Sequence, residues 1–190
     1  MTDSMIGGLI PLLPIGVDIP CSMYGANVPL KIDLLGVLTL DFKGGFNTTV
    51  RTSSTDGIIL EVRSFRVEAD ISPSTPGSGT LIAVSMSTAT TAPRSVLQAI
   101  SSGGLEVLLH LPLTVEVIDK ATGGTHALLA TAPTQHATLR AADVQQFPPV
   151  NQLFTLQEPV QLYSAGGSEA TGTGPAGALE GADFIVNQSA

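Results

Sequence analysis

The chain has 190 residues, which suits one domain with a sizeable core and would be short for two. The net charge is −8 and the 8 basic residues are scattered, so nucleic acid and anionic membrane surfaces are not expected partners. Mean hydropathy is +0.34 with only 13% charged residues, which requires a large core, a ligand cavity or a subunit interface.

Cys21 is the single cysteine, so no intramolecular disulfide can form and nothing favours an oxidising compartment. The apolar run at 5–17 lacks a basic start and is interrupted by Gly and Pro, so a cleaved signal is not expected. An uninterrupted apolar run of about 18 residues is also missing, which argues against a membrane-spanning helix. The expected location is cytoplasmic.

The first part of the chain predicts an arm and a hairpin. Residues 1–27 are expected to form an irregular apolar arm that packs along the sheet. A strand follows at 29–42. A three-residue loop at 43–45, with a glycine in its left-handed position, would then pair Phe42 with Phe46 across the hairpin.

The next strand is predicted at 58–71, after a turn at 55–57 that ends in glycine. Its apolar residues begin on one face and continue on the other. Such a change of phase needs one extra residue, so we expect a β-bulge near Arg63 and Ser64.

A further strand is expected at 80–90, where Met86 is one of the alternating apolar residues. Pro93 suits the first turn of a helix. The sequence therefore predicts one short helix over 93–101, with an apolar stripe made by Val96, Leu97 and Ile100.

The longest regular pattern lies at 105–119, where an apolar residue stands at every second position. This alternation is the period of a β-strand, whereas helical spacing would spread the same side chains around a cylinder. The sequence predicts one long strand whose apolar face is formed by Leu105, Val107, Leu109, Leu111, Leu113, Val115 and Val117.

Three more strands are expected, at 125–132, at 135–141 and, bent by a proline, at 152–163. A loop at 142–151 precedes the last one. The final segment, 165–190, is rich in Gly, Ala and Ser and is expected to be a flexible tail, whose apolar end docks on the same or a neighbouring molecule.

Together these elements predict an all-β fold in one domain over 1–164. Strand candidates joined by short turns favour an antiparallel meander closed into a barrel of about eight strands. Closure would remove the exposed edges of a very apolar sheet. A β-sandwich is the alternative.

The second face of the strand at 105–119 carries the candidate catalytic group. Glu106 and His110 share this face, and if it lines a cavity His110 could donate or accept a proton, tuned by Glu106. The alternative is that this is the solvent face, because the aliphatic side already supplies the core. The pattern favours the solvent face, but no other pair is a better catalytic candidate.

A second candidate cluster is aromatic. The predicted hairpins bring three phenylalanines together, and such a cluster is more often core than ligand site. The candidate ligand-binding residues are Phe42, Phe46, Phe65, Tyr24, Tyr163 and Met86.

No cofactor or metal is expected. A G-x-G-x-x-G match at 172–177 contains Pro175 and follows no strand, so a linker is favoured over a phosphate site. The three histidines, His110, His126 and His136, are too dispersed for a recognised zinc pattern.

The stretch 18–46, which contains DIPC followed by PLKIDLLGVLTLDFKGGF, resembles the opening of a group of small, uncharacterised actinobacterial all-β proteins associated with polyketide and natural-product pathways. The resemblance covers about a fifth of the chain and supplies no catalytic residues. Small β-barrel proteins of such pathways include pericyclic cyclases, and this setting implies a related task.

Three functions fit these observations. The first is a cofactor-independent, pericyclase-like cyclase that binds an apolar polyketide-derived molecule in a barrel cavity, which requires an enclosed cavity of ligand size. The second is a non-catalytic structural or interaction protein, a homo-oligomer formed through the arm or the tail. The third is a passive carrier of the same ligand class, which differs from the first only by turnover.

Overall fold

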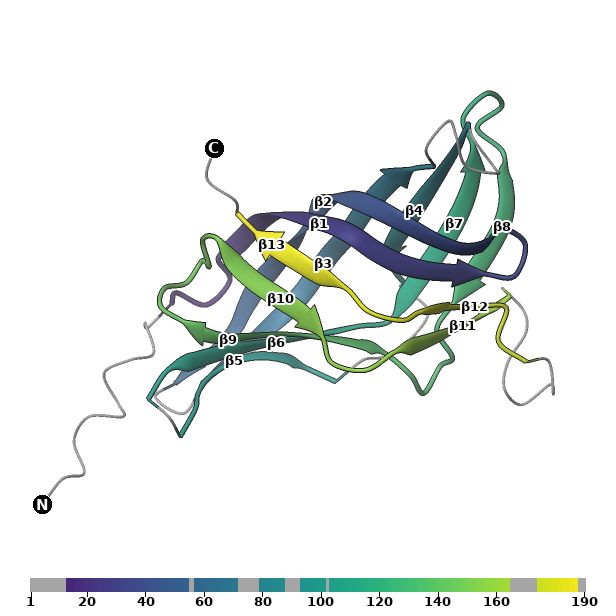
Figure 1. Cartoon of the computed structure of the whole chain (residues 1–190). Helices are drawn as coiled ribbons and strands as arrows, with labels where there is room; N and C mark the ends of the chain where they lie inside the picture. The colour runs from purple at the N-terminus through teal and green to yellow at the C-terminus, as the bar shows by residue number, and fades with distance from the viewer. Residues whose placement is uncertain are drawn as a thin grey trace, which may run out of the picture.

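Figure 1 shows a computed structural model of the chain, which describes residues 13–54, 57–71, 79–87, 93–101, 103–164 and 174–187. Its regular elements are antiparallel β-strands, so the predicted all-β class is confirmed. The strands are β1 (Asp18–Ile32), β2 (Gly36–Ser54), β3 (Gly57–Asp70), β4 (Thr80–Met86), β5 (Ser95–Ala99), β6 (Leu105–Leu111), β7 (Leu113–Asp119), β8 (Thr125–Ala130), β9 (Ala137–Val144), β10 (Gln152–Leu156), β11 (Val160–Ser164), β12 (Gly177–Leu179) and β13 (Asp183–Val186). None of the described residues belongs to a helix that could cross a membrane.

The strands form one 13-stranded sheet that closes on itself through the pairings β12–β1 and β3–β5. The long strands β1, β2 and β3 are shared by two rings of neighbours (Figure 1). One ring continues through β4, β7, β8, β11 and β12, and the other through β5, β6, β9, β10 and β13. This arrangement differs from the single ring of about eight strands that the sequence predicts.

The N-terminal half corrects two expectations. Much of the predicted irregular arm is strand β1, which pairs with β2 from Asp18 onward, while residues 1–12 lie outside the described part. The predicted loop at 43–45 is wrong, because these residues lie inside β2. A Cβ atom on Gly44 would lie 2.0 Å from the Arg66 carbonyl oxygen, so this glycine permits close backbone approach within the sheet rather than a turn.

The hairpin between β2 and β3 agrees with the sequence in one feature and differs in another. The predicted bulge is confirmed, since Asn47 pairs with Ser64 and Thr48 with Val62, which leaves Arg63 as the extra residue. The turn is one residue shorter than expected, because Gly57 already pairs with Ser54.

The predicted helix over 93–101 is wrong, because 95–99 is strand β5, which lies between β3 and β6. Ser95 and Leu97 are buried and alternate with half-buried neighbours, so the segment follows a strand period. Three apolar residues at helical spacing are too short a pattern to distinguish a helix from a strand. The segment forms a strand here because it pairs with the edge of β3 at Ile58–Leu60, where β4 does not reach.

The predicted strand at 105–119 has the expected apolar face, but it is two strands rather than one. All seven aliphatic residues from Leu105 to Val117 are buried. Pro112 divides the segment into β6, which pairs with β5 and β9, and β7, which pairs with β4 and β8. The proline has no N–H for the ladder, so the chain changes neighbours there.

The last strands also differ from expectation. The predicted strand at 152–163 is two strands, β10 and β11, separated at Pro159. The segment expected to be a flexible tail supplies β12 and β13, with Phe184 and Val186 buried in the core of the same chain. Residues 165–173 and 188–190 lie outside the described part.

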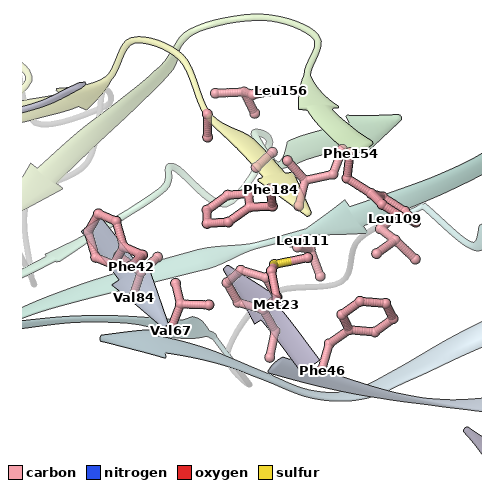
Figure 2. Close-up of a cluster of buried hydrophobic side chains, with 14 of the residues drawn as sticks. Met23, Phe42, Phe46, Val67, Val84, Leu109, Leu111, Phe154, Leu156 and Phe184 are labelled. Carbon is pink, nitrogen blue, oxygen red and sulfur yellow. The ribbon is translucent and has the colours of Figure 1, made fainter. Parts of the chain in front are cut away.

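Each described strand contributes buried apolar side chains to the interior. Figure 2 shows Phe42, Phe46, Phe154 and Phe184 among these buried side chains, and the Phe46 and Phe154 ring centroids lie 6.2 Å apart. The cavity that remains among Phe42, Phe65 and their neighbours has a volume of ≈ 10 Å³, about enough for one water molecule. The expected cavity of ligand size inside the sheet is therefore not found in the described structure.

Candidate functional site

A pocket of ligand size lies on the outside of the sheet, where the two rings separate. β4 pairs with β3 from Arg66 onward, and β5 pairs with β3 only up to Leu60. The stretch 61–65 of β3 has neither strand beside it. A pocket of ≈ 680 Å³ opens to solvent there, between β3, β4, β5 and the Pro112 junction of β6 and β7.

The pocket combines apolar and charged side chains. Its volume is within the range of small-molecule sites, about 300–1,000 Å³. The lining residues are Arg51, Thr52, Ile59, Leu60, Glu61, Val62, Arg63, Met86, Ser87, Pro93, Arg94, Ser95, His110 and Pro112.

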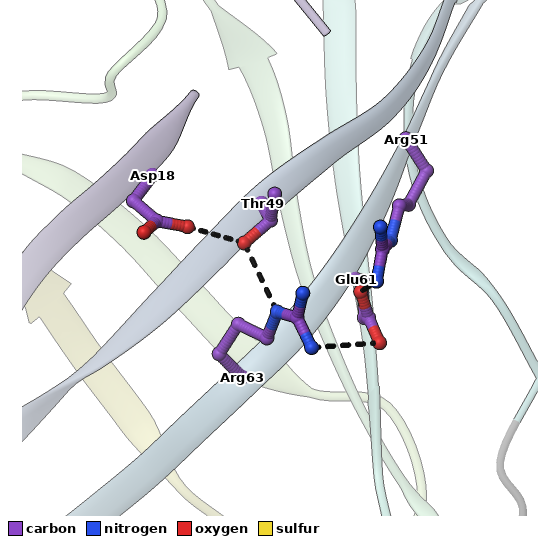
Figure 3. A network of polar contacts seen from close by, with 5 residues as sticks. All are labelled: Asp18, Thr49, Arg51, Glu61 and Arg63. Carbon is purple, nitrogen blue, oxygen red and sulfur yellow. Dashed lines mark hydrogen bonds and ion pairs between the residues drawn. The ribbon is translucent and has the colours of Figure 1, made fainter. Parts of the chain in front are cut away.

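A network of ion pairs and hydrogen bonds forms the charged side of the pocket (Figure 3). Glu61 is paired with Arg51 on β2 and lies 3.4 Å from Arg63 Nη1. The Nε of Arg63 donates to Thr49 Oγ1 at 3.2 Å, and that hydroxyl donates to the Asp18 carboxylate. Glu61 and Arg63 stand two residues apart on β3, so their side chains lie on the same face of the strand.

His110 lies in the pocket wall at the end of β6. Its backbone N–H donates to Ser95 Oγ at 3.0 Å, at the residue where β5 begins. Its ring Nδ1 lies 3.1 Å from Thr138 Oγ1. Burial lowers the pKa of His110 below its ordinary value, and the charge that His136 can carry lowers it further, so the ring is neutral at pH 7.

The His110 and His136 rings meet edge to face, with centroids 5.0 Å apart. Their spacing in the sequence gives no reason to expect a contact, but the structure brings the two rings together. His136 also lines a second, polar pocket of ≈ 470 Å³ beside β9 and the β10–β11 junction. The described residues contain no group of three or more His, Cys, Asp or Glu side chains placed to hold a metal ion.

Glu106 is not brought to His110. It lies four residues away on β6, about 13 Å along the strand, and only 8% of it is exposed. Its carboxylate accepts hydrogen bonds from Gln98 Nε2 at 2.7 Å and Arg140 Nε at 2.8 Å. Burial would raise the pKa of Glu106, but these hydrogen bonds and the Arg140 charge outweigh it and hold that pKa below its ordinary value. The expected tuning of His110 by Glu106 has no contact to support it.

The candidate ligand-binding residues fall into different places. Phe42, Phe46 and Phe65 are buried in the core, which agrees with the interpretation that the pattern favours. Tyr163 is also buried, on β11, and Tyr24 is half-buried on β1. Met86 is the one candidate of this set that lines the outer pocket.

Sequence reasoning missed the charged residues of this pocket. Arg51, Glu61 and Arg63 stand at outward strand positions that look like ordinary solvent positions. The bulge at Arg63 is a usable signal, since bulges often re-aim side chains. Arg94 lies within the segment that the sequence predicts as a helix, so the sequence does not point to it as a pocket residue.

Comparisons with known proteins bear on the fold. No protein-family model matches the sequence, and no curated protein matches it either. Among solved structures, the chain is similar to DynF from the dynemicin biosynthesis pathway of Micromonospora chersina, with a TM-score of 0.70 and 11% sequence identity over 95% of this chain and 83% of that chain. At this identity the similarity shows a shared fold.

Proposed function

We propose that this protein takes part in natural-product biosynthesis by binding a small, largely apolar molecule in the outer pocket. The observation that carries the proposal is the pocket itself, a ligand-sized hollow whose wall combines apolar side chains with polar and charged ones. The fold similarity to a protein of the dynemicin pathway supports the setting. Because the interior is nearly filled, the proposal uses the outer pocket rather than a cavity inside the sheet.

In its finer form, the proposal is a cofactor-independent cyclase. The pocket would hold the two ends of a flexible polyene together, which lowers the entropic part of the barrier to ring closure. Ring closure converts one π bond of the conjugated system into a new carbon–carbon or carbon–oxygen σ bond while the remaining π bonds shift, so no atom or electron is gained or lost. The neutral His110 ring is the group in the wall that would hydrogen-bond to a substrate carbonyl and polarise it.

A passive carrier is the second candidate. It is favoured by the opening of the pocket to solvent, because a cyclisation that needs a dry site is better served by an enclosed one. Carrier and cyclase make the same binding contacts and differ only in turnover.

Binding is tested with a fluorescent neutral polyene, the methyl ester of cis-parinaric acid. Replacing Met86 by Trp fills the pocket from its wall, so we expect the affinity for the ester to fall at least about tenfold. Thr52→Trp, at an exposed lining position that carries little folding risk, should do the same. The control is Leu128→Trp on the exposed side of β8, which should leave binding unchanged. Equal binding by all three variants would contradict the proposed site.

Turnover separates the two candidates. A synthetic linear triene ketone whose ends can close into a ring is incubated with the protein, and ring closure is followed by the loss of polyene absorbance at constant mass. A cyclase accelerates closure, and Met86→Trp returns the rate to that of buffer. Binding of the ketone without acceleration would identify a carrier.

A further inference from the structure

Arg94 differs from the other arginines of the chain. Each of the other four pairs with a glutamate, as seen for Arg51 and Arg63 with Glu61, Arg66 with Glu68, and Arg140 with Glu106. Arg94 has no hydrogen bond or ion pair with any residue that the structure describes. It is exposed and lines the outer pocket.

The rest of the charge at the pocket is balanced. In the network of Figure 3, the two guanidinium groups of Arg51 and Arg63 face the two carboxylates of Glu61 and Asp18. Among the described residues no carboxylate therefore compensates the positive charge of Arg94, in a chain whose net charge is −8. The chain has twice as many acidic as basic residues, so a carboxylate partner for each arginine would be easy to supply. An arginine that has no such partner among the described residues, at a pocket of ligand size, is suited to bind a negative charge on the ligand.

The neighbouring walls define the rest of the ligand. Ile59, Met86, Pro93 and Pro112 give the pocket apolar surface beside this charge. A molecule that matches both features has an apolar body and one anionic end. The fork of a guanidinium group fits the two oxygens of a carboxylate.

We propose that the outer pocket selects a monoanionic ligand, an apolar acid whose carboxylate binds the Arg94 guanidinium while its apolar body lies on Met86 and Pro112. The proposal rests on the proposed function, since it names the ligand class of the same site. A single uncompensated charge matches a carboxylate better than a doubly charged phosphate monoester, which would bring a second charge without a partner.

The test compares cis-parinaric acid with its methyl ester, which differ in charge and share the same polyene. At pH 7.5 and low salt we expect the acid to bind about tenfold more tightly than the ester, because only the acid can form a charge-assisted hydrogen bond with the Arg94 guanidinium. Arg94→Gln should remove this preference and leave the affinity for the ester unchanged. The matched control is Arg66→Gln, an exposed arginine on β3 outside the pocket lining, which should keep the preference.

Salt gives a second readout. Because Arg94 is exposed, raising the ionic strength from about 0.05 to 0.5 M should reduce the preference for the acid several-fold without changing the binding of the ester. Equal affinity of the unmodified protein for acid and ester, or a preference that survives Arg94→Gln, would overturn the inference while the binding site stands. If neither probe binds, the proposed function fails and the inference fails with it.

Discussion

Glu106 is the most buried acidic side chain of the described structure, and its role follows from its partners. The carboxylate lies on the outer face of β6, with Gln98 on β5 and Arg140 on β9 on its two sides. These contacts join three neighbouring strands across the sheet. A carboxylate so engaged stabilises the fold and is poorly placed for proton transfer, so the structure argues for a structural role.

This arrangement predicts a pH-dependent stability. The pKa of Glu106 is lower in the folded protein than in the unfolded chain, so its contribution is present above the unfolded value of about 4.3 and is lost as the pH falls through the folded pKa. We expect Glu106→Gln to lower the free energy of unfolding by about 1 kcal/mol at pH 7, a modest cost because the Arg140 side chain is 42% exposed. Urea unfolding at pH 7 and pH 3 measures this difference, which should shrink at the lower pH.

The control for this measurement is Glu68→Gln, which breaks a more exposed ion pair with Arg66. It should change the free energy of unfolding by less than about 0.5 kcal/mol at either pH. A Glu106→Gln effect of the same size at both pH values would show that the carboxylate charge does not contribute.

Strand β13 shows how a short element completes the sheet. It pairs with β1 at Met23 and Tyr24 on one side and with all but the last residue of β10 on the other. Phe184 faces the core, where one ring atom would lie 2.6 Å from a Cβ on Gly25, so this glycine makes room for the ring. Composition cannot reveal this role, because four residues at the end of a Gly-rich segment carry little pattern of their own.

Strand β13 leads to a prediction about stability. Phe184→Ala should lower the free energy of unfolding by about 3–5 kcal/mol, because it removes a buried ring from the closed sheet. Ile185→Ala is the matched control, since Ile185 is the next residue and lies half-buried on the opposite face, and its cost should be smaller by about 2 kcal/mol or more. Chemical unfolding followed by circular dichroism measures both. Equal costs would mean that β13 does not belong to the core.

For the molecule as a whole, the interior and the outer pocket are separate compartments. The closed sheet holds an apolar core whose cavity has a volume of ≈ 10 Å³, and the hollow of ≈ 680 Å³ lies outside it. The pocket exists because β4 and β5 pair with separate stretches of β3 and leave the residues between them without a neighbouring strand on that side. The same splitting that divides the sheet into two rings therefore creates the candidate site.

Because the two compartments are separate, we expect a substitution in the core to change stability without changing the affinity for the ligand. Ala137→Val adds two methyl groups to the wall of the small inner cavity and should lower stability by about 1–3 kcal/mol through overpacking. Its affinity for the parinaric methyl ester should stay within about twofold of the unmodified protein. Ala142→Val, on the half-buried outer side of β9, is the control and should change neither quantity appreciably. A large loss of ester binding by Ala137→Val would place the ligand inside the sheet.

The sequence by itself determined the fold class, the inward face of 105–117 and the bulge at Arg63. These features are recorded in alternation, which is a local property of a strand. His110 and Met86, which the sequence offers as candidate site residues of an inner cavity, line the outer pocket instead, and their roles stay predictions.

Only the tertiary structure decided where strands break, which strands pair and where the pocket opens. Gly44 looks like a turn residue until the backbone of β3 is seen against it, and 93–101 looks helical until β3 and β6 offer it hydrogen bonds. Strand pairing joins residues that are far apart in the chain, and its hydrogen bonds carry almost no signature in the local sequence. The same holds for Arg94, because the sequence does not show which arginines pair with a glutamate and which one lines the pocket without a partner among the described residues.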